Sequence, residues 1–536
     1  MAIIEHVREA ISKLDLVSVA VLIPTLVVLA HVIPYWVDPH GLRQYPGPWL
    51  AKYSDLWLAR VTAQGNRSEV VHELHKQYGP YARIAPNHLS VSDPAALQEI
   101  YAHGSGTMKS NFYDAFVSIQ RGLFNVRDRV AHARKRKIVS HIFSQKSVLD
   151  FEPHVREYVK MLIRQWDGLF DSAVKGGSGP EGEGWEGRDG KLWLDCLPWY
   201  NYLAFDIIGD LAFGSPFGML TACKDYAPVA KFSEKDTTVH GEIVGLPAVQ
   251  ILNDRGEYSA SMGVLPPWVR PWVKRYIPWF SRGSDAVKNL SGIAVAAVST
   301  RLKAQVDRVD LLSKLKEGKD DEGKPMSIGE LTAEALTQLI AGSDTTSNTS
   351  CAITYYLAAN PSVQTKLQKE LDEVLGSNDD PVSTFNEVKR LTYLDAVINE
   401  TLRIYSTSGI GLPRMAPAGG VMIRGKAYPE GTVLSTPTYT IHRDIAAWGE
   451  DSDDFRPERW FERDQDTMQK AFNPFSFGPR ACVGRNLASM ELQIIISSIL
   501  RHFEFVLEEP EKPLTIREGF LRKPSGCRVG IRRRNL

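Results

Sequence analysis

The stretch FSFGPRACVGR, residues 475–485, places one cysteine among two glycines, a proline and two arginines. Apolar side chains in residues 492–503 keep the i, i+3, i+4, i+7 spacing of a helix with one buried face, so a helix is predicted to begin just after the cysteine. The pKa of a thiol falls near a helix N-terminus, and Cys482 is therefore expected to be a thiolate. Gly484 lets backbone N–H groups approach the sulfur, and Gly478 allows a sharp turn before it.

The other cysteines help to decide what Cys482 binds. The chain has five cysteines, and no two of them form a CxxC or similar pair. This spacing argues against a disulfide scaffold and a structural zinc site, and it is typical of a reducing compartment. One thiolate without a second soft ligand nearby fits an iron whose other positions are filled by a porphyrin. The alternative is a cysteine that only packs in the core.

Composition limits the partners and the domain organisation. The 536 residues are 43% hydrophobic, and 63 basic residues balance 63 acidic ones, so we expect a large core and no nucleic-acid partner. Residues 16–37 are 22 residues without Asp, Glu, Lys or Arg, which is long enough to span a bilayer. We expect residues 1–37 to carry a membrane anchor in contact with lipid and residues 38–536 to form one globular domain. A cleaved signal peptide and a buried core helix are the alternatives.

A long helix is predicted to start after Ser327, which forms a capping box with Glu330, and to end before Pro361. Its length of about 32 residues corresponds to about 48 Å. Small and polar residues interrupt its middle, in the sequence AGSDTT, residues 341–346. A carboxylic acid beside a hydroxyl is a short proton relay, and the alternative is a polar stripe that faces solvent.

Two further segments have local signals. Residues 81–93 are expected to form two short strands around a turn. Residues 174–191, rich in glycine and acidic residues, are expected to form a mobile surface loop.

Three charged residues recur at motif spacing. Glu400 and Arg403 share one helix face, and Arg459 lies in the proline-bounded segment FRPERW. Pairs of this kind are most often surface ion pairs of small effect.

Taken together and in this order, these motifs resemble the cytochrome P-450 superfamily. The residues match its FxxGxRxCxG haem-binding signature, its ExxR pair, its PERF-like segment and its oxygen-binding groove, and the resemblance covers nearly the whole chain after the anchor. It implies a mainly α cytochrome P-450 fold, a helix-rich haem domain with small β-sheets, preceded by a transmembrane helix. The implied cofactor is heme b, iron-protoporphyrin IX, with Cys482 as the metal ligand.

The resemblance also implies roles for single residues. Asp344 and Thr345 would be the catalytic pair that delivers protons for dioxygen activation. The other expected haem contacts are Arg480, Phe475, Gly478, Gly484, His132, Arg136, Arg414, Ala341 and Gly342. His132 stands where the family usually has tryptophan.

Glu400, Arg403 and Arg459 would form a structural triad that supports the thiolate loop. The basic run of residues 134–137 would face an acidic reductase, or it is only a solvated basic face.

Longer stretches resemble one branch of the superfamily, the fungal benzoate para-hydroxylases; they include residues 109–129, 200–220 and 517–526. This branch implies a monooxygenase that converts benzoate to 4-hydroxybenzoate with dioxygen and electrons from NADPH-cytochrome P-450 reductase. A buried carboxylate needs donors or a cation. The candidate substrate contacts are Tyr113, Gln120, Arg121 and Gln338.

Other assignments stay open at this point. The same chemistry could act on another small aromatic, such as a substituted benzoate or a phenylpropanoid. A haem-thiolate isomerase, a peroxide-using enzyme and a non-catalytic membrane haem-binding protein are disfavoured by the intact acid–hydroxyl pair. The anchor and the family imply the endoplasmic reticulum, with the catalytic domain facing the cytosol. Residues 264–280, with three tryptophans and several basic residues, are expected to touch the membrane surface or to form a packed connection.

Overall fold

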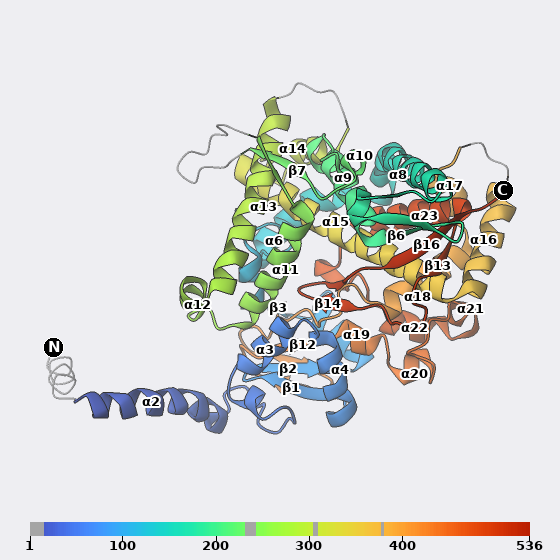
Figure 1. Cartoon of the computed structure of the whole chain (residues 1–536). Helices are drawn as coiled ribbons and strands as arrows, with labels where there is room; N and C mark the ends of the chain where they lie inside the picture. The colour runs from blue at the N-terminus through green and yellow to red at the C-terminus, as the bar shows by residue number, and fades with distance from the viewer. Residues whose placement is uncertain (1–14, 231–242, 304–308, 377–379, 536) are drawn as a thin grey trace.

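Long helices make up most of the body, as the mainly α expectation requires (Figure 1). The computed structural model describes residues 15–230, 243–303, 309–376 and 380–535. The longer helices are α2 (Leu16–Val37), α4 (Arg67–Tyr78), α6 (Arg129–Ile142), α8 (Glu152–Ala173), α9 (Cys196–Phe213), α11 (Ala248–Val264), α13 (Pro278–Lys303), α15 (Ile328–Ala359), α16 (Pro361–Leu375), α18 (Thr392–Ile404) and α23 (Arg485–His502). The shorter helices that the argument uses are α3 (Leu56–Gln64), α5 (Pro94–Tyr101) and α12 (Arg270–Tyr276).

The predicted long helix is confirmed. Helix α15 has 32 residues, and Ser327 and Glu330 form the reciprocal capping box at its start. It runs through the middle of the body and packs along α9, whose residues are all buried (Figure 1). A helix that is apolar all round is stable only inside a core, so α9 and α15 together form the centre of the molecule.

Small sheets flank the helices. The first has the order β1-β2-β12-β9-β3, with β1 (Tyr81–Ala85), β2 (His88–Val91), β12 (Val433–Ser435), β9 (Arg414–Met415) and β3 (Met108–Lys109). Strands β1 and β2 pair antiparallel, which confirms the two strands predicted for residues 81–93. The pair β3–β9 places Lys109 opposite Arg414. Two-stranded hairpins are β7 (Ala227–Ala230) with β8 (Ile243–Leu246), β10 (Val421–Ile423) with β11 (Lys426–Tyr428), and β14 (Ile516–Glu518) with β15 (Arg522–Pro524).

The second sheet corrects one prediction. Its order is β13-β16-β6-β5-β4, with β13 (Phe503–Leu507), β16 (Arg528–Arg533), β6 (Lys191–Asp195), β5 (Trp185–Arg188) and β4 (Ser178–Gly179). The glycine-rich segment 174–191 is thus part of a sheet, and its prediction as a mobile loop was wrong. A side chain at Gly187 would collide with the carbonyl of Ala173, so this glycine permits close packing instead of flexibility.

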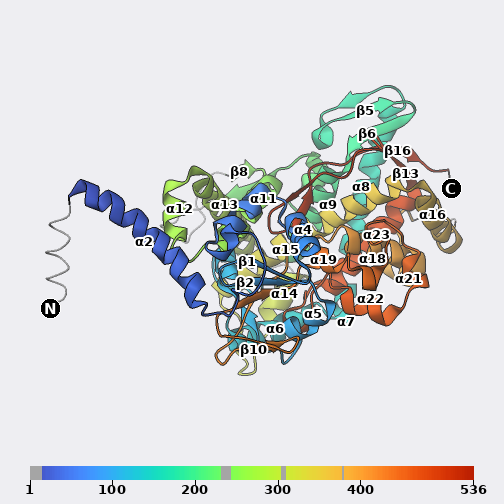
Figure 2. The same cartoon turned by 90° about the horizontal axis from the view of Figure 1, so that it is seen from below.

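Helix α2 extends away from the body (Figure 2). Its segment Ala20–Val37 has a mean hydropathy of 2.0, none of it is buried, and its length and composition would allow it to cross a membrane. Near the start of the body, α12 and its flanks expose Trp268, Trp272 and Tyr276. Leu265, Val273 and Phe280 of the same segment pack in a hydrophobic cluster, so the segment also forms a packed connection. Contact of its exposed aromatic side chains with a membrane surface stays a prediction.

Candidate active site

A cavity of about 350 Å³ lies in front of Cys482. Its walls come from α6, α11, α15 and α23 and from loops around residues 116–125, 407–414 and 473–484. Motifs that lie far apart in the sequence therefore share one space. Of the predicted haem contacts, Phe475, Arg480, Gly484, His132, Arg136, Arg414, Ala341 and Gly342 line this cavity.

The loop before α23 holds Cys482 in place. The Cys482 N–H donates to the carbonyl of Phe475 at 2.8 Å. Gly478 has φ +69°, and any side chain there would collide with the backbone of Tyr101 in α5, so only glycine fits this turn. A Cβ on Gly484 would lie 4.0 Å from the Cys482 sulfur. The glycines thus bring the backbone close to the thiol, which faces the cavity.

The ionisation of Cys482 differs from the expectation. Backbone N–H groups of Gly484 and Arg485 and the charge of Arg136 favour the thiolate, yet burial outweighs them and raises the pKa of the thiol. Bound metal deprotonates a coordinating thiol outright. Binding of a metal would therefore oppose the effect of burial on this thiol.

Basic side chains gather on one part of the cavity wall: Lys109, His132, Arg136, Arg414 and Arg480. Among the described residues, no carboxylate lies within 4.0 Å of any of them. Burial and the neighbouring cations lower the pKa of Arg480 to about 10 and that of His132 to about 3. Buried positive charge without an anion is costly, and two haem propionates would supply the missing charge. The residues present therefore fit a haem.

For Lys109 the sequence left three places open: a contact with a substrate carboxylate, the surface, or the haem. Its side chain is buried and donates to the carbonyl of Phe124, and burial together with Arg414 and Arg480 lowers its pKa well below the usual value. Only the β3–β9 register brings it opposite Arg414. No local signal in the sequence separates it from a surface lysine.

Asp344 and Thr345 face two different cavities. Thr345 lines the cavity of Cys482, and its hydroxyl donates to the carbonyl of Ala341 at 2.6 Å. Asp344 lines a neighbouring polar cavity of about 440 Å³ with Asn348 and Lys523. Its Oδ1 has no hydrogen-bond partner, and burial raises the pKa of the carboxyl. The pair thus connects a polar cavity with the haem cavity, and the alternative of a solvent-facing stripe is wrong.

Glu400, Arg403 and Arg459 form a fully buried cluster, so they are not surface ion pairs. Glu400 accepts from Arg403 Nε at 2.9 Å and from Arg459 Nε at 2.8 Å, and each of the three side chains has an exposed fraction of 0%. Arg403 also donates to the carbonyl of His442 at 2.8 Å. His442 Nε2 in turn accepts from the N–H of Asn473, at the start of the cysteine loop. The cluster is therefore linked to the loop through His442, and also through Trp460, whose Nε1 donates to Glu400 and whose ring contacts Phe472.

The predicted substrate contacts separate into two groups. Gln120 and Gln338 line the cavity, and both polar atoms of the buried Gln338 amide lack partners. Tyr113 is buried behind the wall, with its ring 4.3 Å from Lys109 Nζ. Arg121 lies outside the cavity, half-exposed, and pairs with Asp114 at 2.7 Å. Arg255 in α11 lines the cavity and was missed by the sequence, because no motif surrounds it.

The basic run of residues 134–137 is not a free positive face. Arg134 and Lys135 both pair with Glu330, and Lys137 pairs with Asp321. These ion pairs tie α6 to the start of α15 and the turn before it. The surface that a reductase would meet is therefore less positive than the sequence indicates.

Three other cysteines lie together elsewhere. The sulfur atoms of Cys196, Cys351 and Cys527 are within 4.8 Å of one another, and all three side chains are buried. They come from the start of α9, the middle of α15 and the turn before β16, and none lines the haem cavity. Because their sequence spacing follows no metal motif, only the tertiary structure brings them together.

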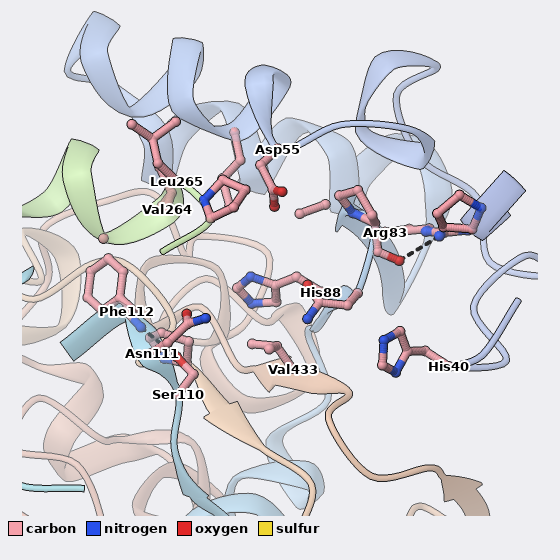
Figure 3. Close-up of a pocket in the computed structure, with 18 of the residues that line it drawn as sticks. His40, Asp55, Arg83, His88, Ser110, Asn111, Phe112, Val264, Leu265 and Val433 are labelled. Carbon is pink, nitrogen blue, oxygen red and sulfur yellow. Dashed lines mark hydrogen bonds between the residues drawn. The ribbon is translucent and has the colours of Figure 1, made fainter. Parts of the chain in front are cut away.

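A further cavity of about 350 Å³ lies where the end of α2 meets the body (Figure 3). His40, Arg83, His88 and Phe112 are among its lining residues, and burial raises the pKa of its Asp55 to about 6. None of the predicted haem contacts or relay residues lines it. It is therefore separate from the cavity of Cys482.

Comparisons with known proteins agree with this geometry. The chain is 49% identical over 518 residues to the benzoate 4-monooxygenase bphA of Aspergillus niger, covering 95% of this chain and 96% of that protein. It is 31% identical over 493 residues to the cytochrome P450 monooxygenase FCK2 of Fusarium pseudograminearum, covering 91% and 81%. The family model "Cytochrome P450" matches residues 44–531. A match of that extent, over a body whose cavity joins the cysteine loop to the acid–hydroxyl helix, shows that the chain belongs to the cytochrome P450 family.

Proposed function

We propose that this protein is a membrane-anchored monooxygenase that hydroxylates benzoate to 4-hydroxybenzoate. The single observation that carries the proposal is the cavity in front of Cys482, which combines a thiol, basic groups without a carboxylate partner and the Thr345 hydroxyl. The near full-length likeness to a benzoate 4-monooxygenase supports the substrate. Another small aromatic acid is the nearest alternative.

Heme b is the cofactor that this site would hold. Cys482 would be the iron ligand, and Lys109, His132, Arg136, Arg414 and Arg480 would bind the propionates. A thiolate-bound haem supplies the activation of dioxygen that insertion of oxygen into a C–H bond requires. Phe475 and Gly478 shape the loop that carries Cys482. Ala341 and Gly342 are small residues and would leave room for the haem at the α15 wall of the cavity. A Cβ at Gly342 would lie 3.0 Å from the Ile208 side chain, a tight contact that a small shift of Ile208 would relieve.

The protein's own residues supply the protons. The Thr345 hydroxyl is at the haem cavity, and the Asp344 carboxyl is at the polar cavity on the other side of the helix. Because burial raises the pKa of Asp344, its acid form persists to a higher pH than that of an exposed aspartate. Asp344 is therefore suited to take up protons from the polar cavity and to pass them to Thr345.

The redox partner and the location follow from the same class of enzyme. The proposed donor is NADPH-cytochrome P-450 reductase, in the endoplasmic reticulum membrane. Helix α2 would anchor the body on the cytosolic side, with the exposed tryptophans of residues 264–280 at the lipid surface.

Titration of the purified haem protein with benzoate tests the substrate. The expected result is a low-spin to high-spin shift of the Soret band, followed by 4-hydroxybenzoate as the product when reductase and NADPH are added. If the Soret band responds to another aromatic acid but not to benzoate, that other acid becomes the proposed substrate. Absence of turnover with any reductase-supplied electrons would favour a non-catalytic haem-binding protein.

A further inference from the structure

Arg255 is a buried cation on the wall of the haem cavity. It lies in α11, has an exposed fraction of 6%, and lines both the haem cavity and the neighbouring polar cavity. One Nη donates to the carbonyl of Phe116 at 3.1 Å, and Nε has no hydrogen-bond partner. No ion pair within 4.0 Å joins it to a carboxylate in the described part of the chain.

The Arg255 guanidinium therefore has no carboxylate as an ion-pair partner among the described residues. Burial lowers the pKa of Arg255 to about 10, and the charge that opposes this effect is the carboxylate of Asp344. An arginine remains protonated at neutral pH even so. A buried cation without a carboxylate partner is stabilised by an anion that enters the cavity it lines.

Arg255 is separate from the basic group assigned to the propionates. The basic side chains that line the cavity, within the described residues, are that group of five and Arg255. The charges that perturb Lys109 and His132 come from within the group, whereas the charge that perturbs Arg255 comes from Asp344 in α15. Arg255 is therefore a cation of this cavity that lies outside the group of five, on α11.

An aromatic wall adjoins this cation. The rings of Phe116, Phe124 and Phe520 contact one another edge to face, with centroids 4.9–5.6 Å apart, and all three residues line the cavity. The Arg255 guanidinium carbon is 5.8 Å from the centre of the Phe116 ring. Aromatic edges and faces of this kind enclose a flat ring well. One open cation beside them matches one carboxylate on that ring.

We propose that Arg255 binds the carboxylate of the aromatic acid substrate and so sets the enzyme's preference for an anionic over a neutral aromatic. The inference rests on the proposed function, because it assumes that an aryl carboxylate enters the haem cavity. It replaces Arg121, which pairs with Asp114 outside the cavity, as the recognising arginine.

The test compares Arg255→Gln, Arg255→Lys and the control Arg121→Gln as full-length haem proteins. Each is titrated with benzoate and with benzamide, its neutral counterpart, and the dissociation constant is read from the Soret shift. We expect Arg255→Gln to weaken benzoate binding by about thirtyfold or more, because a buried charged donor is lost. Benzamide binding should change by less than about threefold, Arg255→Lys should retain part of the benzoate affinity, and Arg121→Gln should behave as the parent.

The outcomes separate this inference from the proposed function. If the parent protein gives no benzoate response, the substrate proposal fails before Arg255 is tested. If Arg255→Gln binds benzoate as the parent does, but forms less product per NADPH, Arg255 is only the counter-charge of Asp344 and the inference is overturned. A normal reduced-CO spectrum shows that each variant holds haem. If Arg255→Gln fails to bind haem, the Arg255→Lys variant decides. Unchanged benzoate affinity in Arg255→Lys overturns the inference, and a loss of affinity for benzoate but not for benzamide supports it.

Discussion

At the scale of single residues, the neighbours Asp344 and Thr345 show why helix geometry matters for chemistry. Successive side chains on a helix point about 100° apart, and here one faces the haem cavity and the other the polar cavity. Asp344 is buried with an unpaired carboxylate oxygen, which is costly unless the group has a use or a bound water. A carboxyl between two cavities can move protons without itself contacting substrate.

Asp344→Asn is expected to lower the hydroxylation rate by about a hundredfold, because the amide cannot pass on a proton. Benzoate should still shift the Soret band, since Asp344 does not line the haem cavity. The measurement is product formed per NADPH consumed with reductase present. Ser343→Ala is the matched control: Ser343 is buried next to Asp344 and its hydroxyl bonds only within the helix, to the carbonyl of Leu339. Equal losses in both variants would contradict a specific role for Asp344.

At the scale of elements, His442 connects α18 to the cysteine loop. Its Nδ1 lies 3.0 Å from the carbonyl of Arg403 and its Nε2 accepts from the N–H of Asn473. This pattern requires a neutral ring with the proton on Nδ1. Burial and the charge of Arg403 lower the pKa of His442 to about 3. Protonation would remove the acceptor for Asn473 and add a third positive charge beside Arg403 and Arg459.

The free energy of unfolding should therefore fall as the pH falls below 6.5. In this range the unfolded chain binds a proton on this histidine and the folded chain does not, so stability is full above the unfolded pKa and is lost toward the folded pKa. One histidine contributes a loss of up to about 2 kcal/mol between pH 6.5 and 5. Urea unfolding midpoints at pH 7, 6 and 5 measure it.

His442→Gln should make this pH dependence less steep by the share of one histidine, because glutamine keeps an acceptor but has no group that titrates. Buried His72, His88 and His132, whose pKa values are also lowered, keep the remainder. The control is His103→Gln, an exposed position whose replacement should leave the slope unchanged. If the urea midpoint of His442→Gln depends on pH as steeply as that of the parent protein, His442 does not contribute to the loss of stability in acid.

At the scale of the whole molecule, exposed apolar surface is found at α2 and at the aromatic residues of α12 and its flanks. Helix α2 is apolar, unburied and directed away from the body (Figure 2). Trp268 and Trp272 are 74% and 63% exposed, which is high for tryptophan in a soluble protein. The apolar helix and the aromatic patch are thus two separate candidate contacts with a membrane.

A chain that lacks residues 1–37 should float with lipid vesicles at least about tenfold less than the full chain, because a patch alone binds reversibly. Its response to benzoate should persist, since no haem-cavity residue lies in the removed segment. Trp268→Ala with Trp272→Ala in the shortened chain should remove the remaining binding. Full flotation of that variant would mean that another surface holds the membrane.

The sequence by itself determined the cysteine loop, the capped start and length of α15, the anchor segment and the family. These are local patterns, and spacing along the chain is sufficient to specify them. Its prediction for residues 174–191 was wrong because glycines that permit close packing have the same composition as glycines of a mobile loop. Only the tertiary structure decided that Lys109 lies with the other basic residues on the cavity wall, that His442 connects the triad to the loop, and that Arg255 rather than Arg121 faces the cavity. Each of these depends on which distant segments meet, and hydrophobic burial and sheet register set those meetings without leaving a motif around the residues involved.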